Sequence, residues 1–215
     1  MKKELVIFGG GGFAREVAWL IADINLQLPI YERWKIIGFV EHTTERVGSS
    51  LNGIPIIDPA ELKVEFSETY AVVAIGSTNL RERAVEQARD LGFKFATLIH
   101  PEVKMDAASV EIGNGCIVCA GNILTVNIKI GDHVILNIDC TIGHDCVIED
   151  YVTISPGCHL SGYTTVRRGA YLGTGAVTVE RHEIGRNTIV GAGAVVVKDI
   201  PRDVIAVGIP ARPIK

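Results

Sequence analysis

The feature that most constrains this chain is an aliphatic residue at every sixth position through its C-terminal half. Neither an α-helix, with a period near 3.6, nor an isolated strand, with a period of 2, produces this spacing. A six-residue period is typical of a parallel β-helix, in which each hexad supplies one short strand and one corner. The series has a single exception, a threonine at its twelfth place: Ile112, Val118, Leu124, Ile130, Leu136, Ile142, Ile148, Ile154, Leu160, Val166, Leu172, Thr178, Ile184, Val190, Val196.

Compact side chains form a second series, two residues before the aliphatic one. Because a tight corner excludes bulk, these side chains are expected to face inward and complete the core. Four of the five cysteines fall on this phase, which predicts buried thiols rather than metal ligands or disulfides: Cys116, Cys140, Cys146 and Cys158. Three hexads make one coil, so residues 101–215 are expected to form about five coils of roughly eighteen residues.

Residues 1–100 follow a different pattern. The apolar run Leu5–Phe8 meets four consecutive glycines and then a segment with helical spacing, which is the start of a βαβ unit. Further strands are expected at 35–40 and 70–75, and a helix at 80–91. The expectation is a small Rossmann-like parallel sheet. Three strands make only about half of a dinucleotide-binding domain, which argues against NAD and favours a single nucleotide.

The first glycine turn reads Gly9-x-Gly11-x-x-Ala14, with Gly12 inside it. Such a turn lets backbone amides and a helix N-terminus approach a phosphate, although glycine-rich turns also serve plain packing. Of these two interpretations, we favour binding of a nucleotide or a nucleotide-linked sugar at this turn.

Gly76 and Ser77 follow the third expected strand, and Glu41 follows the second. Ligands of open α/β sheets bind at the carboxyl ends of the strands, so these residues are candidates for the same site. For Arg81 and Arg83 two interpretations stay open, a phosphate contact or a solvated helix face.

Charge and hydropathy exclude several classes of partner. The net charge is −4 and no basic stripe is present, so nucleic acid is not expected. Apolar runs such as Ala71–Ile75 are too short to cross a bilayer. Met1–Lys3 leads into a strand rather than a signal peptide, which predicts a cytoplasmic protein with no membrane insertion.

Among the six histidines, His144 is the strongest candidate for chemistry. The hexad phase places it at a corner, next to Asp145, with Asn137 about one corner earlier. A histidine titrates near neutrality and a neighbouring carboxylate can orient it, so the group suits a general base. A zinc hydratase of the same fold would need two histidines five residues apart. No two histidines here have that spacing, so no metal is expected.

Residues 137–148, NIDCTIGHDCVI, resemble the active-site segment of the bacterial hexapeptide-repeat nucleotide-sugar acetyltransferases. This family includes the sialic-acid O-acetyltransferases and the bacillosamine-pathway N-acetyltransferases. Four further motifs of the chain resemble the same group: IFGGGGF at 7–13, AIG at 74–76, HP at 100–101 and VGIPAR at 207–212. The resemblance covers essentially the whole chain.

The resemblance implies a left-handed, three-sided β-helix that assembles as a homotrimer, with active sites between neighbouring solenoids. It implies an acetyl-CoA-dependent N-acetyltransferase acting on a UDP-, dTDP- or GDP-linked amino sugar. The catalytic residues would be His144, Asp145 and Asn137, and Gly162, Thr153 and Arg212 would serve acetyl-CoA. The substrate contacts implied in the N-terminal domain are Gly9, Gly11, Gly12, Phe13, Glu41, Gly76 and Ser77.

Three positions depart from the family pattern. Phe13 stands where many relatives carry histidine, Glu41 stands where relatives often carry paired aspartates, and Thr153 replaces a second histidine. The nucleotide and the sugar therefore stay open.

Gly162 lies eighteen residues after His144, so we expect it one coil away, with its amide available to a developing oxyanion. The hexad from Thr178 to Glu183 breaks the repeat, and the coil is expected to loosen or bulge there. Arg181 and His182 in this hexad could contact CoA phosphates or belong to an irregular turn.

Two alternatives to N-acetylation remain at this level. One is O-acetylation of a sialic-acid-type sugar hydroxyl. The other is a non-catalytic nucleotide-sugar-binding protein built on the same frame.

Overall fold

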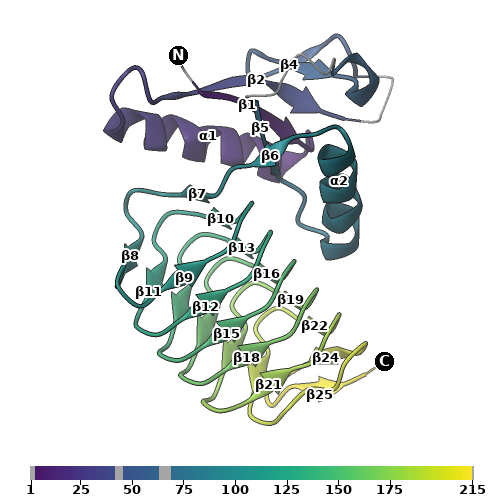
Figure 1. Cartoon of the computed structure of the whole chain (residues 1–215). Coiled ribbons are helices and arrows are strands. Elements are labelled where there is room, and N and C mark those ends of the chain that lie inside the picture. Colours follow the sequence, from purple (N-terminus) through teal and green to yellow (C-terminus); the bar gives the residue numbers. More distant parts are fainter. Residues whose placement is uncertain (1–2, 42–45, 63–68, 215) are drawn as a thin grey trace. The chain divides into compact units, whose positions relative to one another are not determined.

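The computed structural model describes residues 3–41, 46–62 and 69–214 of the 215-residue chain. The chain divides into two compact units, the first ending at Pro101 and the second beginning at Glu102. Figure 1 shows the α/β elements of the first unit and the stacked coils of the second. His42, which follows Glu41, lies outside the described residues. No helix in the described ranges is both long enough and apolar enough to span a bilayer.

The first unit is built on a six-stranded sheet with the order β3-β4-β2-β1-β5-β6. Neighbouring strands are parallel except for the β3–β4 pair, which is antiparallel. The strands of this unit are β1 (Lys3–Phe8), β2 (Trp34–Val40), β3 (Ser50–Leu51), β4 (Ile54–Ile57), β5 (Tyr70–Val73), β6 (Lys94–Phe95) and β7 (Leu98–Ile99). Its helices are α1 (Gly12–Gln27), α2 (Thr78–Asp90) and a 3₁₀ turn, η1 (Pro59–Glu61).

The three strands expected from sequence are present as β1, β2 and β5, but the expected sheet of three strands was too small. Strands β3, β4 and β6 extend it, and each has only two to four residues. Runs this short carry little periodic signal, which is why the sequence did not reveal them. The central strand β1 is fully buried from Leu5 to Ile7, and α1 buries one face made of Ala14, Val17, Leu20 and Ile21.

The second unit is a parallel β-helix, as the six-residue period predicts. Paired strands lie eighteen residues apart, as in Ile117 with Ile135 and Thr141 with His159, so each coil contains three hexads. One face carries β10 (Ile117–Val118), β13 (Ile135–Leu136), β16 (Thr153–Ile154), β19 (Tyr171–Leu172), β22 (Ile189–Val190), β24 (Ile205–Val207) and the antiparallel β25 (Arg212–Pro213).

The two other faces are sheets of six and five short strands. The six-stranded face carries β8 (Lys104–Met105), β11 (Ile123–Leu124), β14 (Thr141–Ile142), β17 (His159–Leu160), β20 (Val177–Thr178) and β23 (Val195–Val196). The five-stranded face carries β9 (Glu111–Ile112), β12 (Lys129–Ile130), β15 (Val147–Ile148), β18 (Thr165–Val166) and β21 (Glu183–Ile184).

Both predicted core series face the inside of the coils. The four cysteines of the compact series are completely buried, and so are most aliphatic residues of the six-residue series. The expected bulge at Thr178 is wrong: β20 pairs in regular register with Leu160 on one side and Val196 on the other. Thr178 is 1% exposed. Its hydroxyl has hydrogen-bond partners inside the coil, so a polar residue is accommodated there without distorting the backbone.

Candidate active site

The centre of the candidate site is a histidine–aspartate pair at a corner of the solenoid. His144 follows β14 after the single residue Gly143, and its Nδ1 lies 2.8 Å from Oδ2 of Asp145. Both side chains remain accessible, at 49% and 33% exposure. Because Nδ1–H donates to the carboxylate, Nε2 keeps its lone pair and can accept a proton.

Asp145 is held in place by its neighbours. Its backbone lies in the left-handed region, with φ of 58°, a conformation that aspartate tolerates better than most residues. Asn127, one coil earlier, donates its Nδ2 to Oδ1 of Asp145 at 3.3 Å. The hydrogen bond with His144, followed by the bond from Asn127, lowers the pKa of the Asp145 carboxyl below its usual value. Asp145 is therefore a carboxylate at neutral pH, as an orienting partner of an imidazole must be.

An aromatic residue that the sequence reasoning missed contacts the imidazole. Tyr163 lies eighteen residues after Asp145, and its ring meets that of His144 edge-on, with centroids 5.1 Å apart. The guanidinium of Arg181, one coil further on, lies 4.2 Å from the centroid of the Tyr163 ring. The same corner position in four successive coils is thus occupied by Asn127, Asp145, Tyr163 and Arg181. Arg181, whose role the sequence left open, contacts the aromatic ring that lies beside His144. The eighteen-residue spacing from Asp145 was the signal that could have found Tyr163.

Gly162 forms the floor beneath the imidazole, one coil from His144 as expected. A Cβ at Gly162 would lie 2.5 Å from Cε1 and 2.6 Å from Nε2 of His144, so no larger residue fits beneath the ring as it stands. Gly143 is needed for the same stacking, because a Cβ there would lie 2.7 Å from the amide nitrogen of Gly162. The two glycines therefore let this turn and the imidazole approach each other closely.

The structure shows different surroundings for the other solenoid residues expected at the site. Asn137 accepts a hydrogen bond from its neighbouring amide, Ile138 N, at 2.7 Å. Thr153 is 4% exposed within β16. Arg212 lies on β25 and donates to the carbonyl of Ala211 at 3.0 Å.

In the first unit, both helices begin at the carboxyl ends of adjacent parallel strands. Gly11 caps α1 after β1, and Ser77 caps α2 after β5, and neither cap is closed by a side-chain hydrogen bond. A Cβ at Gly11 or Gly76 would meet nothing within 4 Å, and one at Gly12 would meet only Arg15, at 3.9 Å. Open space in front of helix N-termini suits an anionic group.

Glu41 closes one side of this turn. Its carboxylate packs directly on Gly10, and Arg46 lies 3.2 Å from its Oε1. Gly9 has φ of 113°, which strongly favours glycine, and a Cβ there would lie 2.9 Å from the Ala74 carbonyl oxygen. Phe13, in the first turn of α1, is half-buried.

Arg81 fits neither of the two interpretations offered by the sequence. It is 1% exposed, and its Nη1 donates to the carbonyls of Ile75 at 2.8 Å and Gly76 at 3.2 Å. Its charge therefore organises the loop between β5 and α2 from inside. Helical periodicity did not show this, because the acceptors are backbone atoms five and six residues earlier.

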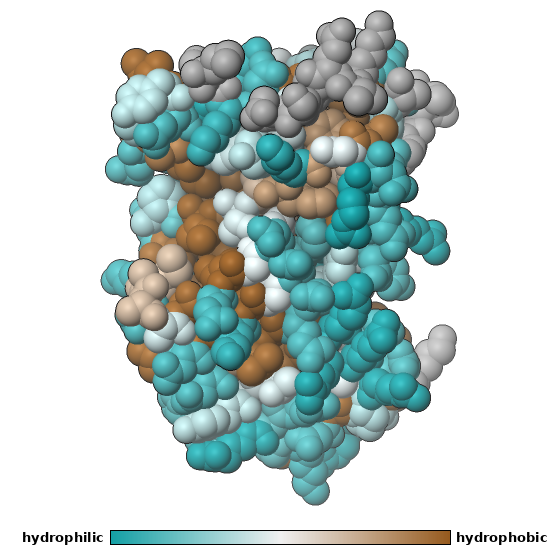
Figure 2. Space-filling view, in the orientation of Figure 1, coloured by the Kyte–Doolittle hydropathy of each residue, from teal (hydrophilic) through white to brown (hydrophobic). Residues whose placement is uncertain are grey.

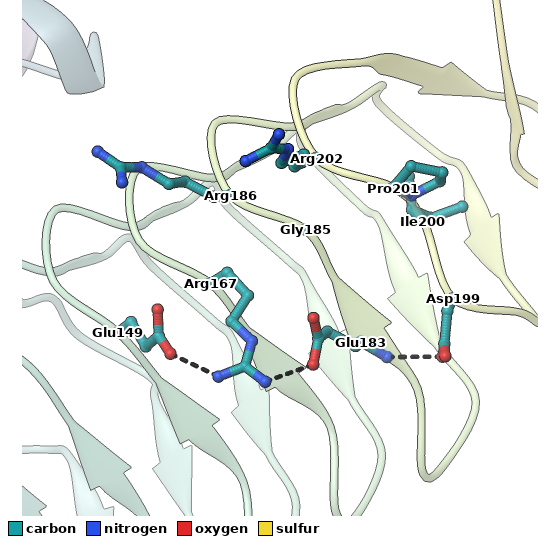
Figure 3. Close-up of a pocket in the computed structure, with 9 residues that line it drawn as sticks. All are labelled: Glu149, Arg167, Glu183, Gly185, Arg186, Asp199, Ile200, Pro201 and Arg202. Carbon is teal, nitrogen blue, oxygen red and sulfur yellow. Dashed lines mark hydrogen bonds and ion pairs between the residues drawn. The ribbon is translucent and has the colours of Figure 1, made fainter.

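A separate hollow of about 600 Å³ lies on the solenoid away from His144, and Figure 3 shows the residues that line it. Arg167 bridges Glu149 at 2.7 Å and Glu183 at 2.5 Å, and these two carboxylates raise the pKa of its guanidinium. Arg186 and Arg202 border the same hollow with exposed side chains. This hollow is thus lined by a surface ladder of charges, and His144 is not among its lining residues.

Within the described ranges, no group of three or more His, Cys, Asp or Glu side chains could hold a metal ion. All five cysteines are buried, and none of them forms a disulfide. The hydrogen bond with Cys158, together with burial, raises the pKa of the Cys140 thiol, and burial raises that of Cys146. Cys140 and Cys146 are therefore packing groups rather than nucleophiles.

The chain matches two family models. The model of the PglD N-terminal domain matches residues 4–88, and that of the bacterial transferase hexapeptide (six repeats) matches residues 127–162. Among solved structures, the acetyltransferase domain of PglB from Neisseria gonorrhoeae FA1090 is 34% identical, with a TM-score of 0.87 over 99% of this chain and 100% of that one. The chain belongs to the hexapeptide-repeat nucleotide-sugar acetyltransferases.

Two further relatives support this assignment. WeeI from Acinetobacter baumannii AYE is 33% identical, with a TM-score of 0.87 over the whole of both chains. A histidine variant of perosamine N-acetyltransferase from Caulobacter crescentus, in complex with CoA and GDP-perosamine, is 31% identical, with a TM-score of 0.87 over 99% and 97% of the two chains. A Schizosaccharomyces pombe protein with a suggested acetyltransferase function is 47% identical over 45 residues, which span only 22% of that protein. Family membership identifies the chain as an acyltransferase with the left-handed β-helix of this family.

Proposed function

We propose that this acyltransferase moves the acetyl group of acetyl-CoA to the amino group of a nucleotide-linked amino-deoxy sugar, with His144 as the general base. The observation that carries the proposal is the 2.8 Å contact between Nδ1 of His144 and the Asp145 carboxylate, which leaves Nε2 as the proton acceptor. Relatives support both substrates, since PglB is solved with acetyl coenzyme A and the Caulobacter enzyme with CoA and GDP-perosamine.

The reaction follows from these groups as a direct transfer. The sugar amine attacks the thioester carbonyl carbon, and Nε2 of His144 takes the proton that the nitrogen loses. The carbonyl oxygen becomes an oxyanion, for which the Gly162 amide is the proposed donor. The tetrahedral intermediate then expels the CoA thiolate, which is protonated by the imidazolium. Asp145 stabilises the charged imidazole between the two proton transfers.

The sugar nucleotide is proposed to bind the first unit at the N-termini of α1 and α2. Gly9, Gly11, Gly12 and Gly76 would bring backbone amides close to the diphosphate, with Ser77 beside them. Glu41 and Phe13 are then candidates for the remaining contacts with the nucleotide and the sugar. GDP is the nucleotide named for the Caulobacter relative.

Acetyl-CoA is proposed to lie on the solenoid near Gly162, with Arg212 as a candidate for its phosphates. Asn137 and Thr153 stay as predictions for this site. For Thr153 the low exposure argues that a contact with the thioester would need a local opening of the β16 face.

A homotrimer is proposed as the working assembly. Large hydrophobic side chains remain exposed on the solenoid, and Figure 2 shows hydrophobic residues gathered along one strip of its surface. Exposed apolar patches of this kind are typical of protein interfaces. The exposed residues include Ile123, Val126, Ile138, Val147 and Val179. A trimeric mass in multi-angle light scattering is expected, and a monomeric mass would contradict it.

The experiment that tests the function is release of free CoA, followed with a thiol reagent, for acetyl-CoA with UDP-, dTDP- and GDP-linked amino sugars. Wild-type protein should release CoA with at least one of them, and His144→Ala should lose about 10²–10⁴-fold in kcat while acetyl-CoA still binds. Transfer to hydroxy sugars in preference to amino sugars would favour O-acetylation. No release with any acceptor would favour a binding protein.

A further inference from the structure

The one polar residue in the aliphatic series, Thr178, is connected to the candidate active site. Elsewhere along the face that carries β11, β14, β17, β20 and β23, the amide that follows a residue of the six-residue series donates to the backbone carbonyl of the series residue seventeen positions later. Gly143 N donates to Leu160 O at 2.8 Å, and Val179 N donates to Val196 O at 2.9 Å. At Ser161, the corresponding residue seventeen positions later is Thr178. The Ser161 amide donates instead to the Thr178 hydroxyl, at 3.1 Å.

A second buried threonine completes the arrangement. Thr164 is fully buried, its hydroxyl donates to the Ser161 carbonyl at 2.7 Å, and it lies 2.9 Å from the Thr178 hydroxyl. Since the Thr164 proton is used on a carbonyl that can only accept, the proton between the two hydroxyls must come from Thr178. The three groups thus form a closed ring: Ser161 N–H to Thr178, Thr178 O–H to Thr164, and Thr164 O–H to Ser161 C=O.

This ring holds both backbone polar groups of the residue directly before Gly162. Gly162 is the floor of the His144 imidazole, with 2.5 Å between its Cβ position and Cε1. Hydrogen bonds that close on themselves in a buried site reinforce one another and define one geometry. An aliphatic residue at position 178 would fill the core equally well, but its side chain could accept no hydrogen bond from the Ser161 amide.

We propose that Thr178, together with Thr164, is a positioning residue that fixes the Ser161–Gly162 backbone against His144. The inference rests on the proposed function, because the significance of this backbone depends on His144 acting as base and Gly162 as oxyanion donor. A role in catalysis, rather than in folding, then explains why the six-residue series has a threonine at position 178.

The direct test is Thr178→Val, which keeps the shape of threonine and restores the aliphatic series. The melting temperature should fall modestly, since the substitution leaves the buried Ser161 amide without its side-chain acceptor. The kcat should fall about 10- to 100-fold, with the KM for acetyl-CoA within about twofold of wild type, because a displaced donor acts in the transition state. Thr178→Ser, which retains the hydroxyl, should recover most of the turnover.

Thr188→Val is the matched control. Thr188 is also fully buried, but its hydroxyl bonds to the carbonyl of Pro201, and no described contact connects it to His144. It should leave kcat nearly unchanged. If Thr178→Val fails to fold, Thr164→Val removes the other hydroxyl of the ring and is expected to give the same loss. A folded Thr178→Val or Thr164→Val enzyme with turnover within about twofold of wild type would overturn the proposal, as would an equal loss in Thr188→Val.

Crystal structures of wild type, Thr178→Val and Thr188→Val make the test independent of the substrate. The Ser161–Gly162 backbone and the His144 ring should move by about 0.5 Å or more in Thr178→Val only. An unmoved backbone overturns the positioning role even if no acceptor sugar has been found. Absence of CoA release by wild-type protein would instead overturn the proposed function, so the two failures are distinguishable.

Discussion

Gly162→Ala is the substitution whose effect follows most directly from the distances in the site. The added methyl would lie 2.5 Å from Cε1 and 2.6 Å from Nε2 of His144, whereas ordinary contact begins near 3.4 Å. The imidazole or the turn must therefore move by about 1 Å. A displacement of this size at a reacting group costs about 10²-fold in rate, equivalent to about 2.7 kcal/mol in the activation free energy.

The fold should tolerate this change, because the clash is with a side chain that is half exposed and free to turn outward. Gly162 also lacks the positive φ that penalises alanine at many other glycines of the chain. The expected result is a kcat about 100-fold lower in the CoA-release assay, with a melting temperature close to that of wild type. Asp145 should still pair with the displaced ring, because the two residues are adjacent in sequence.

Gly191→Ala serves as the control, because its Cβ would meet a side-chain atom at a similar distance, 2.7 Å from Cγ1 of Val207, near the C-terminal end of the solenoid. Its kcat should stay within about twofold of wild type. If Gly162→Ala turned over acetyl-CoA at nearly the wild-type rate, the position of the imidazole above Gly162 would be irrelevant to catalysis, and the reasoning would be refuted.

Three further predictions concern ionisation. Because the bond with His144 lowers the pKa of Asp145, its carboxylate should stay charged between about pH 5 and 9. Asp145→Asn should then lower kcat by about 10²–10⁴-fold at every pH in that range. Burial raises the pKa of Glu149, but hydrogen bonds from Arg167 and a backbone amide outweigh it and lower the pKa below 4.5. Its stabilising effect should be present at neutral pH and vanish as the pH falls through the lowered value, so Glu149→Gln should cost at most ~1 kcal/mol near pH 7 and nothing in acid. Cys140 should not react with a thiol reagent until the protein unfolds.

Each of these predictions has a result that would contradict it. A strongly pH-dependent effect of Asp145→Asn would mean that the carboxylate titrates in the working range. For Glu149, denaturation midpoints at neutral and acid pH should be compared with those of Glu111→Gln, whose carboxyl lies on the same solenoid face. An equal change in both variants would show a general charge effect. Rapid labelling of native protein at Cys140 would show that the coils open.

Much of the candidate site could be read from the sequence because the repeat fixes which residues lie one coil apart. The eighteen-residue spacing placed Gly162 next to His144 without any coordinates. The same rule applied to Asp145 leads to Asn127 and Tyr163, which contact Asp145 and the imidazole ring respectively. They were overlooked because a tyrosine or an asparagine at a corner has no chemical signature of its own.

Other features could not be predicted, because they depend on which atoms meet inside the fold. The hexad pattern marked Thr178 as irregular and suggested a bulge, whereas a second threonine fourteen residues earlier gives its hydroxyl a partner. Helical spacing left Arg81 between a solvated face and a phosphate contact, whereas two backbone carbonyls of its own loop bind it. A sequence pattern indicates which way a side chain points, but not whether a hydrogen-bond acceptor lies within its reach.

The sequence by itself determined the solenoid, its coil length, its buried thiols and the corner that carries His144. These features follow from the six-residue period, because the local geometry of one hexad is repeated in the next and each coil makes the same contacts as the coil before it. The tertiary structure decided how that corner is supported: by the glycine floor, by the edge of the Tyr163 ring, and by the buried threonines beneath Ser161. These contacts join residues from different coils at distances of a few ångströms, and only the folded backbone sets such distances.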